Sequence, residues 1–267
     1  MINLLIAAAL GLAFPSASSP PADSVDAKLG PAMFVVGDAD TTIFLFGTFH
    51  ALDGRSQWFS EGIRRAFENS DELVLETLVP EYRGTPQPAL GAAAAVQIAP
   101  SASFLATTRM AIDAGKQEGM QVGNGADMVL RHVAEREGKS VQGLETLDSQ
   151  LAMFGRMPGQ LAVARSTTAP APNPAATLAQ SMMAMQSAWT RGDQSLLVQM
   201  LDQLDRASPA MYRMLFTERN GRWADWVSAR LKTPGVVFVA VGAGHLVGKD
   251  SVLVRLAQRG IDSRRVN

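Results

Sequence analysis

The chain contains no cysteine among its 267 residues, and this absence removes several classes of protein at once. Without thiols there is no disulfide, no cysteine nucleophile and no cysteine-ligated zinc, and no lipid can be attached through an N-terminal cysteine. Any bound metal must therefore be held by His, Asp, Glu or Asn side chains.

An excess of charge of either sign is also lacking, since the formal net charge is −1. Such a balance gives no general attraction to nucleic acid or to an anionic membrane, so we expect neither as a partner. Apolar residues make up 47% of the chain and charged residues 18%, which is enough to bury a full core. The length fits one large domain or a domain with a sizeable insertion.

The apolar run at residues 4–14 is too short to span a bilayer as a helix. Small residues follow it, as in a secretory signal peptide cleaved near Ala17. No Lys or Arg precedes the run, and the alternative is a partly buried N-terminal helix. We expect residues 1–18 to be a signal peptide and 19–30 a linker, so that the protein is periplasmic or secreted and has no stable membrane anchor.

Strand-like patterns lie early and late in the chain, and helical patterns fill the middle. The predicted strands are 32–36, 41–46, 72–76, 140–144, 235–241 and 262–266. The turn signal at 37–40 predicts that the first two form a hairpin. The second and fifth runs are apolar on both faces, which is typical of central strands.

Helical spacing of apolar residues predicts helices between these strands. The predicted helices are 60–69, 102–117, 126–138, a stretch through 147–154, several between 177 and 231, and 250–259. Two segments rich in Pro and Ala, 79–101 and 165–176, are predicted to be irregular, and the first is a candidate lid. We therefore expect an α/β fold in one domain, 31–267, with a mixed central sheet flanked by helices and a helical insertion at roughly 100–231.

Two of the three histidines occur in matching contexts. A buried strand runs into Gly47-Thr-Phe-His50, and another runs into Gly242-Ala-Gly-His245. Ligands in open α/β sheets bind beyond the carboxyl ends of the strands, so both rings would share one crevice if the strands are neighbours. Neutral imidazole is a common metal ligand, and the alternative is that each ring is a satisfied core or cap residue. His132 lacks this context and is predicted to be structural or exposed.

Two glutamates also follow predicted strands. Glu76 ends the strand 72–76, and Glu145 follows the strand 140–144. A buried carboxylate must be paired or metal-bound, so either could bind a metal or act as the general base for a bound water. Either could equally cap a helix or pair with an arginine.

A polar cluster, Glu218-Arg219-Asn220, precedes an apolar helical stretch. Arg219 could neutralise a carboxylate or hold a substrate oxyanion, while Asn220 or Asp225 could cap the helix. Asp127 is predicted to be an ordinary helix N-cap. The sequence has no nucleophile elbow, P-loop, dinucleotide fingerprint or His-Glu-x-x-His motif.

In this order, the motifs resemble those of the TraB/GumN family, which includes the pheromone-shutdown proteins and the Tiki metalloproteases. The resemblance covers nearly the whole chain after its N-terminal segment. The segments that carry it are 45–50, Trp58, 70–76, 125–127, 143–146 with Gln150 and Leu151, 218–220 with Trp223, and 241–246 with Gly248.

The resemblance implies a fold like that of the erythromycin-esterase and ChaN-like proteins. It also implies metalloprotease activity dependent on manganese or cobalt, as in Tiki-like members. The family's site residues correspond to His50, Glu76, Glu145, Arg219, Asn220 and His245. The segment after Glu81 and the one near 169–174 depart from the family's pattern, which bears on the substrate cleft more than on the metal site.

These observations lead to the hypothesis of an exported metal-dependent hydrolase that acts on a peptide or protein. His50 and His245 would bind one divalent Mn, Co or Zn ion with Glu76 or Glu145, and the remaining glutamate would activate the bound water. Arg219 and Asn220 would stabilise the oxyanion. The alternative is a non-catalytic protein that binds haem, metal or a peptide. The sequence does not predict the substrate or the oligomeric state.

Overall fold

The computed structural model describes residues 30–78, 102–156 and 174–267. The predicted signal peptide, the linker up to residue 29 and the candidate lid at 79–101 lie outside the described residues. The same holds for residues 165–173 of the second segment that was predicted to be irregular, whereas its last residues belong to a helix that begins at Pro174.

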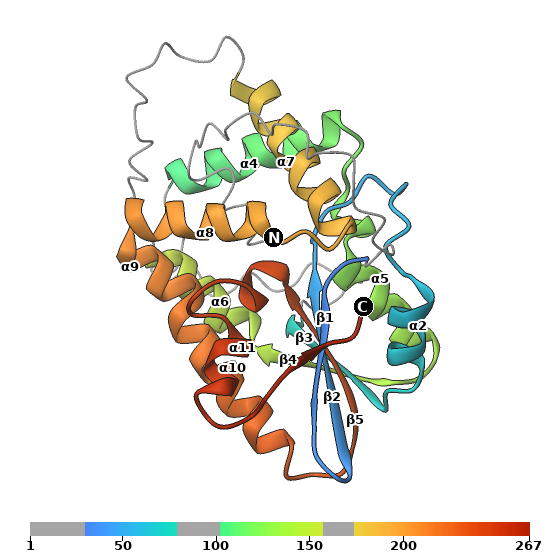
Figure 1. Cartoon of the computed structure of the whole chain (residues 1–267). Helices are drawn as coiled ribbons and strands as arrows, with labels where there is room; N and C mark the ends of the chain where they lie inside the picture. Colours follow the sequence, from blue (N-terminus) through green and yellow to red (C-terminus); the bar gives the residue numbers. More distant parts are fainter. Residues whose placement is uncertain (1–29, 79–101, 157–173) are drawn as a thin grey trace, which may run out of the picture.

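A six-stranded mixed sheet forms the centre of the fold (Figure 1). Its order is β4-β3-β5-β2-β1-β6, with the first four strands parallel and β1 and β6 antiparallel to their neighbours. The strands are β1 (Met33–Gly37), β2 (Thr41–Thr48), β3 (Glu72–Thr77), β4 (Ser140–Glu145), β5 (Gly235–Gly242) and β6 (Arg264–Arg265). The α/β fold and the hairpin of β1 and β2 are therefore confirmed.

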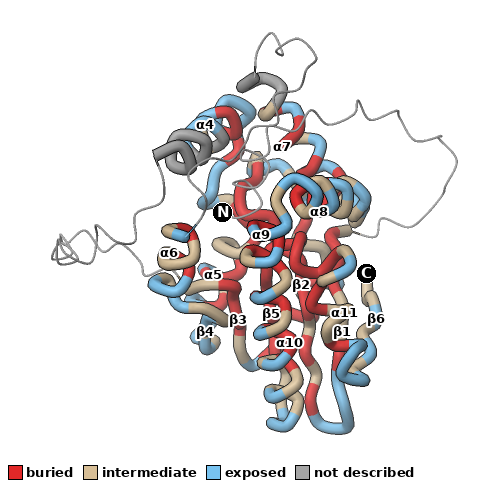
Figure 2. The backbone as a smooth tube through the Cα atoms, turned by 90° about the vertical axis from the view of Figure 1, so that its left-hand side faces the viewer, coloured by how far each residue is buried: buried red, intermediate tan, exposed pale blue. Residues whose placement is uncertain are grey.

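Helices cover both faces of the sheet and the end where its parallel strands finish (Figures 1 and 2). Helices α2 and α5 pack on one face and α10 and α11 on the other, while α4, α7 and α8 lie beyond the carboxyl ends. The helices are α2 (Glu61–Glu68), α4 (Ala102–Gln117), α5 (Ala126–Arg136), α6 (Leu147–Gly155), α7 (Pro174–Thr190), α8 (Ser195–Ala207), α9 (Pro209–Tyr212), α10 (Glu218–Arg230) and α11 (Val252–Ala257). None of the described helices is both long and apolar enough to cross a membrane.

The apolar patterns of β2 and β5 make them the central, most buried pair of strands (Figure 2). They run parallel and in register, with Gly47 opposite Val241 and Thr48 opposite Gly242. The two Gly-x-x-His segments therefore leave the sheet side by side. Gly47 allows this close approach, because a Cβ on it would lie 3.1 Å from both Cα and Cβ of Ala243, and one of the two segments would have to shift by a few tenths of an ångström.

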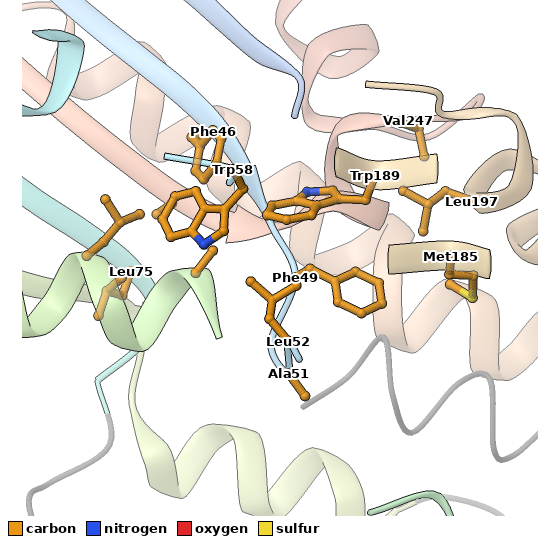
Figure 3. Close-up of a cluster of buried hydrophobic side chains, with 14 of the residues drawn as sticks. Phe46, Phe49, Ala51, Leu52, Trp58, Leu75, Met185, Trp189, Leu197 and Val247 are labelled. Atoms are coloured by element: carbon orange, nitrogen blue, oxygen red, sulfur yellow. The ribbon is translucent and has the colours of Figure 1, made fainter. Parts of the chain in front are cut away.

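A cluster of aromatic rings supports the first of these segments (Figure 3). The ring of Trp189 on α7 packs against Phe46, Phe49 and Trp58, with ring centroids 5.9–6.4 Å apart. Its indole N–H donates a 2.7 Å hydrogen bond to the carbonyl of Gly47, where β2 ends. Buried aromatic contacts of this kind stabilise the core, and here they also fix the backbone that leads to His50.

The helix that carries Arg219 begins earlier than the sequence predicts. Helix α9 continues through a π-helical turn, Arg213–Thr217, directly into α10, so residues 218–220 lie inside a continuous helix. Asn220 and Asp225 therefore do not cap it, and Asp225 instead pairs with Arg259 at the surface. Such wide turns shift the register of a helix and occur often near functional sites.

Candidate functional site

Three side chains converge where β2, β3 and β5 end. His50 follows β2, Glu76 lies near the end of β3, and His245 follows β5. Nε2 of His50 lies 3.9 Å from Oε2 of Glu76, and Nε2 of His245 lies 3.8 Å from the same oxygen. All three residues are buried. The two histidines therefore lie on either side of one glutamate oxygen at the ends of neighbouring strands.

His245 is held as a neutral ring with its proton on Nδ1. The side-chain amide of Asn220 donates through Nδ2 to the carbonyl of Asp250 at 2.8 Å, so its oxygen faces Nδ1 of His245 at 2.6 Å. Nε2 accordingly keeps its lone pair and accepts from Nη1 of Arg219 at 3.2 Å. Complete burial and the adjacent guanidinium lower the pKa of His245 to about 3.

Glu76 is an ionised carboxylate with partners on both oxygens. Oε1 accepts from Nη2 of Arg219 at 2.7 Å and from Gln150 at 3.4 Å, while Oε2 accepts from the backbone N–H of Gly242 at 3.2 Å. Burial alone would raise its pKa, but the charge and hydrogen bond of Arg219, together with the two neighbouring histidines, hold the pKa well below its usual range.

Arg219 joins the two glutamates predicted from the sequence. Its guanidinium has no exposed surface, and it binds Glu145 in the bidentate manner, with Nε to Oε1 at 2.9 Å and Nη2 to Oε2 at 2.7 Å. The guanidinium also lies 4.7 Å from the ring centroid of Trp223. Glu145 has a second partner in Arg222, at 3.3 Å. Of the roles predicted for Arg219, the structure shows the neutralisation of carboxylates.

Asp127 is the site residue that the sequence prediction missed. Its Oδ1 lies 3.1 Å from Nδ1 of His50, in the first turn of α5. The N-cap of this helix is Gly125, so the prediction that Asp127 caps it is wrong. Burial opposes ionisation of Asp127, but its contact with His50 outweighs burial and lowers the pKa of the carboxyl. The signal that could have identified it is its place in the motif 125–127.

His50 has no hydrogen-bond partner among the described residues on either ring nitrogen, although it is buried. The contact with Asp127 is close enough for an ion pair but lacks the alignment of a straight hydrogen bond. A buried polar atom without a partner is unfavourable and asks for an explanation. Here both nitrogens lie near carboxylate oxygens, those of Glu76 and Asp127, an arrangement that suits a bound cation. His132, by contrast, is exposed, as predicted.

Imidazole nitrogens and a carboxylate oxygen are suitable ligands for a divalent metal ion, but here these atoms lie slightly too far apart to bind one without a shift. Ligand atoms around a tetrahedral metal lie about 3.4 Å apart when each bond is about 2.1 Å, against the 3.8 and 3.9 Å found here. Among the described residues, no group of three or more potential ligands is spaced to hold a metal. To bind a metal, Nε2 of His245 would have to give up its hydrogen bond with Arg219. The distances from both Nε2 atoms to Oε2 of Glu76 would also have to shorten by several tenths of an ångström.

The charges of the site favour such a cation. Three carboxylates (Glu76, Glu145 and Asp127) and two guanidinium groups (Arg219 and Arg222) lie in or beside the site, and each neutral histidine has one ring nitrogen that can accept. The described part of the site thus carries one negative charge more than positive. An unpaired buried charge is costly, so a bound cation would stabilise the arrangement.

The chain was compared with models of known protein families, with curated proteins and with solved structures. The family model of the TraB/PrgY/gumN family matches residues 32–94 and 83–265 of this chain, which together span His50, Glu76, Glu145, Arg219, Asn220 and His245. No curated protein and no solved structure matches the chain. The chain belongs to the TraB/PrgY/gumN family.

Proposed function

We propose that this protein is a hydrolase that cleaves peptide bonds, with a divalent Mn, Co or Zn ion held by His50, His245 and Glu76. The observation that carries the proposal is the convergence of two Nε2 atoms on one carboxylate oxygen at 3.8 and 3.9 Å. A bound cation would supply a Lewis acid that polarises the scissile carbonyl and makes a water molecule more acidic.

Glu76 and Glu145 take different roles in this proposal. Glu76 faces both ring nitrogens and is kept ionised, which suits a ligand. Glu145 is oriented by Arg219 and Arg222 and is assigned the role of general base. The Glu145→Gln variant should keep its fold and its affinity for the metal while kcat falls by roughly 10²–10⁴-fold.

Arg219 and Asn220 are better suited to positioning than to direct contact with an oxyanion. The guanidinium of Arg219 is committed to Glu76, Glu145 and His245. Both polar atoms of the Asn220 side chain also have close partners, so neither group is free to receive a developing negative charge. Arg219 holds the two carboxylates in place, and Asn220 holds the tautomer of His245.

A cavity of about 540 Å³ is lined in part by Ala51, the residue after His50, and is proposed to receive an apolar side chain of the substrate. Its size is that of an ordinary ligand pocket. The lining comes from the residue after His50 and from α4, α7 and the segment before α5: Ala51, Ile112, Gly115, Lys116, Met120, Gln121, Val122 and Met182.

The test is cleavage of a peptide library by metal-free protein to which Mn²⁺, Co²⁺ or Zn²⁺ is added back. We expect metal-dependent cleavage that is lost in His50→Ala and in His245→Ala and kept in His132→Ala, the exposed histidine that serves as the matched control. Absence of metal-dependent cleavage, or a His50→Ala variant as active as the wild type, would refute the proposal.

The second candidate is a protein that binds a peptide without cutting it, and the apolar cavity favours it. The two candidates differ in what happens to a bound peptide. Mass spectrometry of a peptide recovered from the protein after incubation with metal gives fragments for a hydrolase and the intact peptide for a binding protein.

Export to the periplasm or the medium is a separate proposal that rests on residues 1–18, outside the described residues. Sequencing the N-terminus of the protein recovered outside the cytoplasm tests it, and a chain that begins near Ser18 supports it. A chain that retains Met1 and remains in the cytoplasm would refute it.

A further inference from the structure

His50 and His245 have matching contacts, and the helices that supply them lie on opposite faces of the sheet. Each ring places Nε2 near Oε2 of Glu76 and Nδ1 near a side-chain oxygen of a flanking helix. For His245 that oxygen is Oδ1 of Asn220 on α10, at 2.6 Å. For His50 it is Oδ1 of Asp127 on α5, at 3.1 Å, and α5 and α10 cover opposite faces of the sheet (Figure 1).

We propose that Asp127 is a positioning residue that fixes the proton of His50 on Nδ1 and so turns the lone pair of Nε2 toward Glu76. A neutral imidazole carries one proton, and the hydrogen bond made by one nitrogen decides the state of the other. The proposal deepens the proposed function, on which it rests, because both Nε2 atoms then present lone pairs to the same point.

Backbone contacts at the start of α5 hold Asp127 next to His50. The N–H of Ala126 donates to the carbonyl of Phe49 at 2.9 Å, which docks the first turn of the helix onto the segment that carries His50. Gly125 allows the approach, because a Cβ there would lie only 2.3 Å from the carbonyl oxygen of His50. The helix is therefore fixed to the histidine by backbone contacts, and Asp127 follows two residues after the glycine.

One oxygen of the Asp127 side chain, Oδ1, faces the ring of His50. Oδ1 of Asp127 is buried, has no hydrogen-bond partner in the described part of the chain, and lies 3.1 Å from Nδ1 of His50. The two atoms are within reach but not aligned, and we expect a small rotation of the ring to complete the bond. In metal sites, such partners of the second ring nitrogen typically contribute 10–100-fold to metal affinity.

The competing explanation is that Asp127 only complements the positive end of α5, as acidic residues in first turns generally do. Asp148 in the first turn of α6 provides the matched control, because it is exposed and has no contact with either histidine. A helix-end effect predicts the same outcome at both positions. A positioning role predicts a change in the state of His50 at Asp127 alone.

The experiment is two-bond ¹H–¹⁵N correlation spectroscopy of the metal-free full chain labelled on histidine, at a pH two units above the ordinary pKa of histidine. The chain has three histidines, so His132→Gln and His245→Gln variants assign the signals. We expect His50 and His245 to carry their protons on Nδ1. Asp127→Ala should move the proton of His50 toward Nε2, while Asp148→Ala leaves it and His245 stays unchanged in both.

Two further variants guard against misfolding and against a purely structural effect. Asp127→Ser keeps a residue that favours helix starts but is too short to reach the ring, so it should behave as Asp127→Ala does. Asp127→Asn retains an oxygen acceptor and should restore the Nδ1 tautomer. Calorimetric titration with Mn²⁺ should show a loss of roughly 10–100-fold for the Ala and Ser variants, and little for Asn.

The proposal is overturned if His50 carries its proton on Nε2 in the wild type, or if Asp127→Ala and Asp127→Ser leave its tautomer unchanged. These outcomes are independent of catalysis, because the spectra need neither metal nor substrate. A protein that shows the expected tautomer shift and cleaves no peptide refutes the proposed hydrolase alone. An active metalloprotein without the shift refutes only the role of Asp127.

Discussion

Replacing Arg219 by Leu should destabilise the protein strongly, and more so at neutral than at acidic pH. The variant keeps an apolar stem of similar length but leaves Glu76 and Glu145 without the guanidinium that binds both at 2.7 Å. Removing one partner of a buried ion pair costs about 3–5 kcal/mol, because the remaining charge stays buried and unpaired. For a domain of this size the melting temperature should fall by roughly 6–20 °C.

The pH dependence of this effect follows from Glu76. In the wild type its folded pKa lies below the unfolded value of about 4.3, so its contribution is present above that pH and is lost as the pH falls below it. Without Arg219, burial dominates and the folded pKa rises above the unfolded one. The penalty is then largest at pH 7 and shrinks as the pH falls through the raised pKa, so the two stabilities should converge toward pH 5.

Urea unfolding at pH 7 and pH 5, followed by tryptophan fluorescence and circular dichroism, measures both quantities. Arg64→Leu is the control, because this arginine pairs with Glu61 and Glu68 on an exposed helix face and should change stability much less. The triple variant Arg219→Leu, Glu76→Gln, Glu145→Gln should recover a large part of the loss. A loss at pH 7 below about 1 kcal/mol, or one that grows on acidification, would refute the reasoning.

Two further predictions use matched pairs of residues. Gly125→Ala should lower the free energy of unfolding by several kcal/mol, because its Cβ would lie 2.3 Å from a backbone oxygen. Gly62→Ala, on α2 with nothing within 4 Å, should leave the free energy of unfolding unchanged or raise it by up to about 1 kcal/mol. Equal effects of the two changes in thermal unfolding would contradict the close approach of α5. Val122→Trp, which would fill the cavity lined by Ala51 and Val122, should lower kcat/KM for apolar peptides about tenfold. Met110→Trp, at a similarly exposed position outside the cavity lining, should leave kcat/KM unchanged. A Val122→Trp variant with unchanged kcat/KM would remove the cavity from the substrate site.

The sequence predicts the centre of this fold well because its signals there are local. The apolar runs of β2 and β5 mark buried strands, and the glycine after each run marks a tight turn, so the positions of His50 and His245 follow from neighbouring residues alone. Glu76 is found in the same way at the end of β3. The pairing of β2 with β5 brings the two histidines together. The sequence does not predict this pairing, which the argument for a shared site assumes.

The partners of these residues depend on packing that no local pattern encodes. Asp127 reaches His50 because α5 docks on the backbone after β2, and Asn220 reaches His245 because a π-helical turn sets the register of α10. From sequence, both look like ordinary residues at helix starts. The bidentate ion pair of Arg219 with Glu145 joins residues 74 positions apart, and the sequence pattern of neither segment predicts it.

The central claim is that His50 and His245 act together at one site with Glu76, and metal affinity measured across a double-mutant cycle tests it most directly. Calorimetric titration with Mn²⁺ would compare the wild type, His50→Ala, His245→Ala and the double variant, with His132→Ala as the control. If one ion uses both rings, either single change should abolish most of the affinity and the double variant should lose little more. Additive losses, or a wild type that binds no better than the double variant, would contradict the claim.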